Sequence, residues 1–285
     1  MGKDMLIARL RNNYHRNLCK KIIFIRKGIP NFADGGSKTS VAIALKITDR
    51  LNYPLAKEAP PGQTAGILFE QITKDFLKDS FKLLNHLRPG KWMFAINQSI
   101  SHFDQYEHVA NLQRMLQEKT EFAAALGGDY LVTPDITVGR YPVTDAEINQ
   151  TTRVVGVDES LCQYTPLRSS NRPSSNLILH ATISCKWTMR SDRAQNIRTE
   201  ALNLIRNRKG NTPHIVAVTA EPLPTRIASL ALGTGDLDCV YHFALPELRE
   251  AVQEVGSEDQ LEMLTGMIDG RRLRDISDLP FDLAI

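Results

Sequence analysis

The sequence predicts an α/β protein in which helices flank a mixed central sheet. Apolar residues recur at helical spacing through most of the first half, and runs rich in β-branched residues begin only after about residue 130. From there, strand and helix patterns alternate. The composition, with 42% hydrophobic and 24% charged residues, is that of a folded globular chain and excludes disordered, collagen-like and disulfide-stapled classes. We expect a single domain over residues 1–285.

Helices are expected to dominate the first half, with prolines and glycines at their ends. The expected elements are, in order, a helix over 4–27, a turn-rich break over 28–36, a helix from about Ser37, a break over 60–62, a helix over 64–87, a short strand over 92–96 and a helix over 103–126.

Strands are expected in the second half, where Val, Ile and Thr are enriched. The expected elements are β-rich runs over 130–138, 154–157 and 177–186, a helix over 192–208, a strand over 214–220, a helix over 225–232, a strand over 239–243, a helix over 246–255 and then a polar tail.

Several function classes are excluded by the charge, apolar and cysteine patterns. The longest apolar runs fall far short of the ~20 residues of a membrane span, and the N-terminus lacks a signal-peptide pattern, so we expect a cytoplasmic protein. The four cysteines lie too far apart for a zinc or redox motif, which favours separate reduced thiols. Residues 1–30 hold eight Lys/Arg against one Asp, which favours a polyanionic partner.

Polar residues stand where a buried sheet would carry apolar ones. Pro134 and Asp135 interrupt one β-rich run, and Ser184 and Lys186 end another. Because strand side chains alternate, Ser184 and Lys186 should share a face, about 6.6 Å apart along the strand, with Cys185 opposite. Taken alone, a Pro-Asp pair commonly opens a turn, and a Ser-x-Lys is commonly a solvated strand tip.

Glu200 adds a carboxylate to this set. It lies three residues after Ile197 and four before Leu204, so it belongs to the face that the apolar residues use. A buried acid needs a partner. Carboxylates near a lysine suit metal-assisted phosphodiester hydrolysis, because Mg²⁺ prefers oxygen ligands and an ammonium stabilises charge on the phosphorane. Alternatively, Glu200 lies on the helix surface or pairs with Arg193 or Arg198.

The segment Arg190-Ser191-Asp192-Arg193 begins the expected helix just beyond Lys186. An Arg fork matches guanine O6 and N7, and a carboxylate accepts from cytosine N4, so the segment predicts readout of G and C in the major groove. The alternative is a Ser191 or Asp192 helix cap with exposed arginines.

Together these motifs resemble the CCGG-specific branch of type II restriction endonucleases in the PD-(D/E)XK superfamily. The resemblance covers nearly the whole chain and implies a PD-(D/E)XK restriction-endonuclease-like core. In that branch the second acid of the metal site stands on the helix, as Glu200 does, while Ser184 occupies the strand position.

The resemblance implies a role for each catalytic residue. Asp135 would ligate Mg²⁺, two ions per active site, with the Cys185 carbonyl as a further ligand. Lys186 would orient or activate the attacking water. Glu200 and Glu70 would complete the acidic cluster, with Ser184 beside them; the role of Glu70 rests on the resemblance alone.

The resemblance also implies the DNA-binding residues and the partners. Arg190, Asp192 and Arg193 would read the inner CCGG. The outer base pair would be read by Asp34, Gln63 and Arg226, which suggests GCCGGC cut after the first G. Double-stranded DNA, further copies in a dimer or, preferably, a tetramer, and a cognate methyltransferase would be the partners.

Purely structural interpretations of Asp34, Gln63 and Arg226 stay open, and so do two other functions. Asp34 could form an Asx turn, Gln63 could merely begin a helix and Arg226 could be a surface arginine. A structure-selective or repair nuclease on the same fold would not need the base readers. A catalytically silent DNA-binding protein would show a broken acidic cluster.

Overall fold

The computed structural model describes residues 5–58, 60, 62–117, 131–156, 160–171, 176–233 and 235–285. Two compact units divide the chain: the first comprises residues 1–88, 183–202 and 214–285, and the second comprises residues 89–182 and 203–213. In the described ranges the main sheet has the strand order β3-β4-β5-β6-β7-β8, and strand β5 (Ile178–Lys186) runs from the second unit into the first.

The first unit begins with helix α1 (Leu6–Lys21), which is shorter than the predicted helix over 4–27. The prediction is wrong beyond Lys21, because the chain turns into a hairpin of β1 (Ile25–Arg26) and β2 (Ile29–Pro30). Lys27 and Gly28 have positive φ angles of 51° and 77°, as a tight two-residue hairpin turn requires. The β-branched run before this turn favours the hairpin over a further helical turn.

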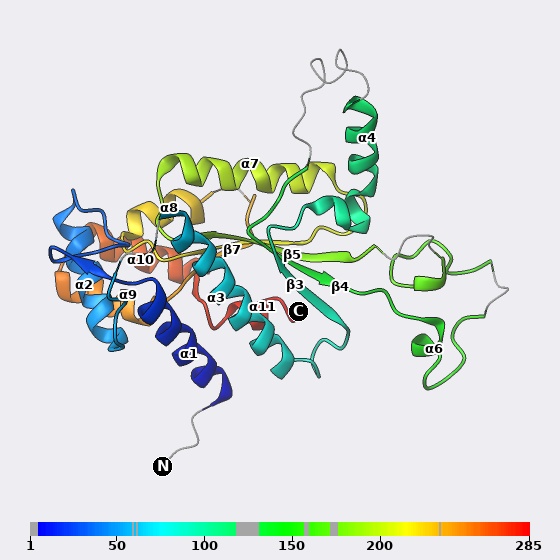
Figure 1. The fold of residues 1–285 in the computed structure, drawn as a ribbon, viewed down its shortest axis with the longest axis horizontal. Helices are drawn as coiled ribbons and strands as arrows, with labels where there is room; N and C mark the ends of the chain where they lie inside the picture. Colours follow the sequence, from blue (N-terminus) through cyan, green and yellow to red (C-terminus); the bar gives the residue numbers. More distant parts are fainter. Residues whose placement is uncertain are drawn as a thin grey trace. The chain divides into compact units, whose positions relative to one another are not determined.

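Helices α2 (Lys38–Leu51) and α3 (Gly62–Leu83) confirm the two other helices predicted for this unit. The Ser37 side chain caps α2 by accepting a hydrogen bond from the Ser40 N–H. Helices α1 and α3 run side by side (Figure 1), where the Tyr14 hydroxyl lies 3.2 Å from the Thr73 hydroxyl.

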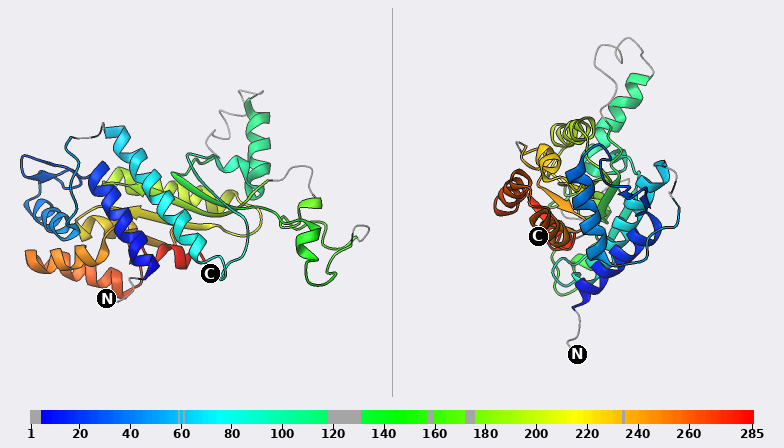
Figure 2. Two further views of the ribbon diagram at one scale, coloured as in Figure 1. Left: turned by 60° about the horizontal axis from the view of Figure 1, so that its bottom comes forward. Right: turned by 90° about the vertical axis from the view of Figure 1, so that its left-hand side faces the viewer.

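The remaining strands of the first unit are β6 (His214–Thr219), β7 (Cys239–His242) and β8 (Leu273–Asp275), and they are parallel. Parallel neighbours need crossover connections, which are supplied by α8 (Pro224–Ala231), α9 (Leu245–Val255) and α10 (Glu258–Asp269). Figure 2 shows α1 and α3 on one side of these strands and α10 on the other.

The predicted polar tail after residue 255 is wrong. It folds into α10, β8 and the short helix α11 (Leu279–Asp282). Its apolar residues are interspersed with charged ones, and Met267, Leu273 and Leu279 are at most 1% exposed. The segment is therefore part of the core.

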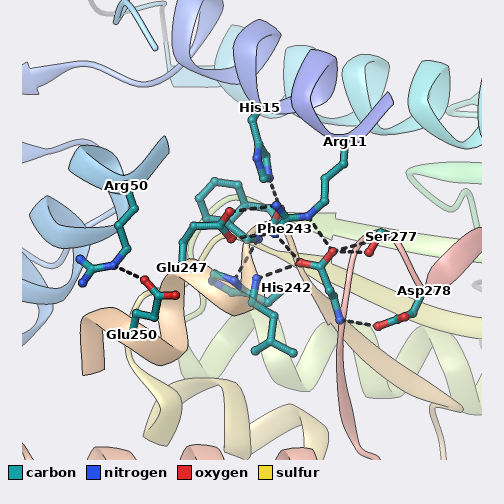
Figure 3. Close-up of polar contacts among 12 residues, drawn as sticks. Arg11, His15, Arg50, His242, Phe243, Glu247, Glu250, Ser277 and Asp278 are labelled. Carbon is teal, nitrogen blue, oxygen red and sulfur yellow. Dashed lines mark hydrogen bonds and ion pairs between the residues drawn. The ribbon is translucent and has the colours of Figure 1, made fainter. Parts of the chain in front are cut away.

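Arg11 of α1 joins this C-terminal part to the N-terminal helices (Figure 3). Its guanidinium donates to both carboxylate oxygens of Glu247 at 2.8 and 2.6 Å and to both of Asp275 at 2.8 Å. Nearby, the His15 ring lies 2.8 Å from the Phe243 carbonyl. Arg11, one of the basic residues predicted to favour a polyanionic partner, is thus engaged inside the protein.

The second unit contains the antiparallel pair β3 (Trp92–Ile96) and β4 (Ile136–Arg140), together with the start of β5. The Gln105 side chain donates to the Leu179 carbonyl and accepts from the Leu179 N–H, at 2.7 and 2.9 Å. The other described elements of the second unit are the 3₁₀ helices η1 (Ile100–His102), η2 (Asp104–Tyr106) and η3 (Ser169–Asn171) and the α-helices α4 (Glu107–Gln117) and α6 (Asp145–Ile148).

Three predictions for the second unit need correction. The helix expected over 103–126 begins as 3₁₀ turns and becomes α-helical at Glu107, and residues 118–130 lie outside the described ranges. The β-rich run over 130–138 becomes a strand only at Ile136, so Asp135 precedes the strand. Residues 154–156 form no strand, and residue 157 lies outside the described ranges.

The predicted fold class is confirmed, because helices flank a sheet with both antiparallel and parallel pairs. Helix α7 (Ser191–Asn207) follows β5, as predicted. None of the four cysteines, all in described ranges, forms a disulfide. Within the described residues, no helix is both long and apolar enough to cross a membrane.

Candidate functional site

An aromatic cluster in the first unit holds Lys186 and Glu70 near each other. The Trp187 ring packs edge-on against the rings of Phe69 and Phe32, with centroids 5.1 and 5.9 Å apart. Phe69 directly precedes Glu70 on α3, and Trp187 directly follows Lys186 at the end of β5. Because these rings are at most 9% exposed, their packing fixes the backbone of both neighbouring residues.

Lys186 and Glu70 line one cavity of about 660 Å³, which we call the lysine cavity. The cavity also contains three more predicted site residues, Cys185, Asp192 and Arg193. Its full lining is Phe24, Asn31, Pro60, Ala65, Gly66, Glu70, Cys185, Lys186, Trp187, Thr188, Asp192, Arg193 and Asn196.

Glu70 is a buried acid, only 9% exposed, in the middle of α3. On the same helix, Leu77 is fully buried whereas Ile67 is half exposed. Ser184 is also buried at 9% exposure, but it is not among the described residues that line the lysine cavity.

The oxygen donors of the lysine cavity fit Mg²⁺. The buried Glu70 carboxylate is a hard oxygen ligand of the kind that Mg²⁺ prefers, and the predicted Cys185 carbonyl would be another. Within the described ranges, no three His, Cys, Asp or Glu side chains gather closely enough to form a complete metal cage. Mg²⁺ keeps several waters and commonly binds through one or two carboxylates and a substrate phosphate, so this donor set fits it.

Glu200 lies on α7 one turn beyond Asn196, which lines the lysine cavity, and its side chain is half-buried. The two arginines proposed as its alternative partners make other contacts. Arg193 donates to the hydroxyl and carbonyl of Thr188 at 2.8 and 2.9 Å. Arg198 donates to carbonyl oxygens of α8.

A second cavity, the arginine cavity, brings together three of the predicted DNA-binding residues, Asp34, Arg190 and Arg226. Its volume is about 690 Å³, within the range of ligand sites. Its lining consists of Asn31, Phe32, Ala33, Asp34, Gly35, Thr188, Met189, Arg190, Ser191, Glu221, Thr225, Arg226 and Ser229.

Asp34 and Arg226 form an ion pair in the arginine cavity. Asp34 also accepts a hydrogen bond from the Gly36 N–H at 3.0 Å, so the predicted Asx turn is present beside the ion pair. The Gly36 bond, the Arg226 guanidinium and the charge of Arg190 together lower the pKa of Asp34. These neighbours favour the charged form of the carboxylate, which accepts hydrogen bonds more strongly than the neutral form.

The two cavities share Asn31 and Thr188 in their linings. The start of α7 serves both, because Arg190 lines the arginine cavity while Asp192 and Arg193 line the lysine cavity. The helix begins at Ser191, and the Ala194 N–H bonds to the Arg190 carbonyl. Neither Ser191 nor Asp192 therefore occupies the cap position, and the capping alternative is wrong.

Sequence reasoning missed Glu221, Thr188 and Asn31. Glu221 is 1% exposed, and burial raises its pKa. It follows the buried apolar strand β6, and an acid at the end of such a strand was the available signal. The Asn31 amide donates to the Ile22 carbonyl at 3.0 Å and holds the hairpin loop. No local pattern marks Asn31 or Thr188.

Asp135 and Gln63 are the remaining predicted site residues. Asp135 belongs to the second unit, where it is half-buried and its carbonyl accepts a hydrogen bond from the Asn97 N–H at 3.1 Å. Gln63 is in the first turn of α3, and its side chain lies outside the described part of the structure. Their roles stay predictions.

Comparisons with known proteins give one consistent family. A family model described as NgoMIV restriction enzyme matches residues 14–285. The type II restriction enzyme NgoMIV of Neisseria gonorrhoeae is 47% identical over 287 residues, which cover 98% of this chain and 99% of that enzyme. A solved complex of the restriction endonuclease PspGI with substrate DNA is 17% identical with a TM-score of 0.31, over 78% of this chain and 62% of that chain.

Proposed function

The chain belongs to the NgoMIV restriction enzyme family and is a type II site-specific deoxyribonuclease, and we propose that it cuts double-stranded DNA at GCCGGC. Cleavage falls after the first G of each strand and leaves 5′-phosphates. The cytoplasm is its proposed compartment.

One observation carries this proposal. Arginine and aspartate side chains suited to G and C line two cavities with common walls, and one of these cavities also holds Lys186 and the buried Glu70. The side chains that we assign to the inner base pairs thus lie in the first unit near Lys186 and Glu70.

The inner CCGG is assigned to Arg190, Asp192 and Arg193 at the start of α7. Arg193 uses one guanidinium nitrogen for Thr188, which leaves the rest of its fork to meet guanine O6 and N7. Asp192 is exposed and accepts from cytosine N4.

The outer base pair is assigned to Asp34, Arg226 and Gln63. Asp34 is kept ionised by its neighbours, so it can accept from cytosine N4. Arg226 reads guanine, and its ion pair with Asp34 sets the orientation of both side chains before DNA binds.

The chemical step is assigned to the lysine cavity. Lys186 donates to the attacking water and stabilises the charge that develops on the phosphorane. Asp135, Glu70, Glu200 and the Cys185 carbonyl would hold two Mg²⁺ ions. When bound, these ions polarise the phosphate and lower the pKa of water.

Ser184 takes the strand position that carries the second acid elsewhere in the superfamily, while Glu200 on α7 supplies that carboxylate. In-line attack then releases the 3′-oxygen and leaves phosphate on the 5′ side.

The proposed assembly follows from the palindromic site. A palindrome presents the same bases to two subunits related by a two-fold axis, so a dimer is the minimum and a tetramer is our proposal. Residues 1–285 act as one endonuclease domain. A methyltransferase with the same specificity is the expected partner, because the host genome carries the same sites.

Asp135→Ala tests the proposal. We expect this variant to bind a GCCGGC duplex as the wild type does but not to cut it in Mg²⁺. Glu107→Ala, which removes an exposed acid of the same unit, is the control and should cut normally. Sustained cutting by Asp135→Ala would remove Asp135 from the mechanism.

The wild type separates the rival functions in the same assay. Binding without cutting would favour a silent DNA-binding protein, and preferential cutting of branched DNA would favour a structure-selective nuclease.

A further inference from the structure

Glu221 is a buried carboxylate between the two segments that carry the proposed base readers. It is 1% exposed and lines the arginine cavity. One carboxylate oxygen accepts from the Met189 N–H at 2.8 Å, and the other accepts from the Leu223 N–H at 3.2 Å. The same side chain therefore bonds to two segments that are more than thirty positions apart in the sequence.

Each of these segments leads directly into a helix with readers in its first turn. Met189 precedes Arg190 and α7, whose first turn contains Asp192 and Arg193. Leu223 caps α8, and its carbonyl accepts from the Arg226 N–H at 3.0 Å. Glu221 thus bonds to the backbone just before α7, which carries the proposed inner readers, and to the backbone just before α8, which carries the proposed outer reader Arg226.

A second tie joins the same two helices farther along. Arg198 of α7 donates to the Ser229 and Leu230 carbonyls of α8 at 2.7 and 3.2 Å. A Cβ at position 233 would lie 1.8 Å from the Arg198 Nη1, so any other residue there would displace this guanidinium. Glu221 and Arg198 thus join α7 and α8, with the segments that lead into them, at two points.

The electrostatic setting explains why a carboxylate suits this position. Each carboxylate oxygen of Glu221 accepts from one of two backbone N–H groups, and both groups would lose this partner without the side chain. Burial opposes ionisation and raises the Glu221 pKa; the charge of Asp34 raises it further, while the two N–H groups and Arg226 act against both effects.

We infer that Glu221 is a positioning residue that locks the inner and outer base readers into one rigid arrangement, so that the six base pairs are read as a unit. This inference rests on the proposed function. It assigns a specificity role to a side chain that is too buried to touch a base.

The test is Glu221→Gln, which keeps the size of the side chain but has only one acceptor oxygen, so one N–H loses its bond. Glu247→Gln is the matched control, because Glu247 is a largely buried acid of the first unit that bonds to Arg11 (Figure 3) and lines neither cavity. Glu221→Asp, which keeps the charge and shortens the reach, replaces Glu221→Gln if that variant does not fold.

The measurement is kcat/KM on the site that the wild type cuts, divided by kcat/KM on duplexes with one inner or one outer base pair changed. We expect Glu221→Gln to lower both ratios about tenfold or more, a difference of about 1.4 kcal/mol. Glu247→Gln should keep both ratios, even if it melts at a lower temperature.

Wild-type ratios in the Glu221 variant that folds would overturn the inference, and so would an equal loss of specificity in the Glu247 control. If the wild type cuts a palindrome other than GCCGGC, the proposed site is wrong, while the ratios on the true site still decide the role of Glu221. If the wild type cuts no DNA, the proposed function and this inference fall together.

Discussion

Replacing Arg11 by Met should destabilise the protein strongly, because Arg11 neutralises two largely buried acids. Glu247 and Asp275 are 18% and 10% exposed in their side chains, and each receives two hydrogen bonds from Arg11. Removing one partner of a buried ion pair costs about 3 to 5 kcal/mol. With about 2 to 4 °C per kcal/mol, the melting temperature should fall by roughly 6 to 20 °C.

The loss of stability in Arg11→Met should depend on pH, and the surroundings of Glu247 and Asp275 determine the direction. Burial alone would raise the pKa values of Glu247 and Asp275, but hydrogen bonds and charge from Arg11 outweigh it and lower both. In the wild type this stabilisation is present above the ordinary carboxyl pKa and is lost as the pH falls below it. Without Arg11, burial raises the pKa values of both acids. The loss of stability in Arg11→Met should therefore be largest near about pH 7, where both acids would carry charge, and smaller near about pH 4.

Thermal unfolding at these two pH values, followed by circular dichroism, measures the effect. Arg9→Met is the control on the same helix; Arg9 is exposed, so its loss should stay within about 0.5 kcal/mol. Equal losses for the two variants, or a penalty for Arg11→Met that grows as the pH falls, would refute the reasoning.

Three further predictions concern DNA. Arg193→Ala should lower discrimination at one inner base position by about 1 to 3 kcal/mol in competitive cleavage, whereas an equal loss on every sequence would make Arg193 a phosphate contact. Arg226→Gln should relax the outer base pair alone; relaxed inner discrimination would contradict the assignment. Glu200→Ala should reduce the single-turnover cleavage rate far more than Ser184→Ala, and the reverse order would show that the strand position carries the chemistry.

The sequence predicted most helices and strands of the sheet because their patterns are local. Helix α2 begins at its capping Ser37, and strand β3 has the predicted bounds. Prediction from the sequence failed for elements that depend on tertiary contacts. The hairpin over 25–30 was predicted as part of a helix, because its left-handed turn at Lys27 and Gly28 is not evident from the sequence. Strand β8 is only three residues long, and its pairing with the parallel strand β7 defines it.

The candidate site was predicted only in part, for a related reason. Arg190, Asp192 and Arg193 are close in sequence and could be found as a motif, whereas their shared surroundings come from distant segments. Glu70 is an acid inside a long helix, and nothing local distinguishes it from a solvated one. Glu221 accepts hydrogen bonds from the backbone N–H groups of Met189 and Leu223. Because any residue except proline has such an N–H group, the sequence does not indicate these partners.

Digestion of a sequenced plasmid in Mg²⁺, with mapping of every fragment end, tests the proposed cleavage at GCCGGC. We expect discrete cuts after the first G of each GCCGGC, with phosphate on the 5′ ends and no other products. Scattered cuts without a common sequence, or an intact plasmid under conditions where the protein binds GCCGGC specifically, would contradict this proposal.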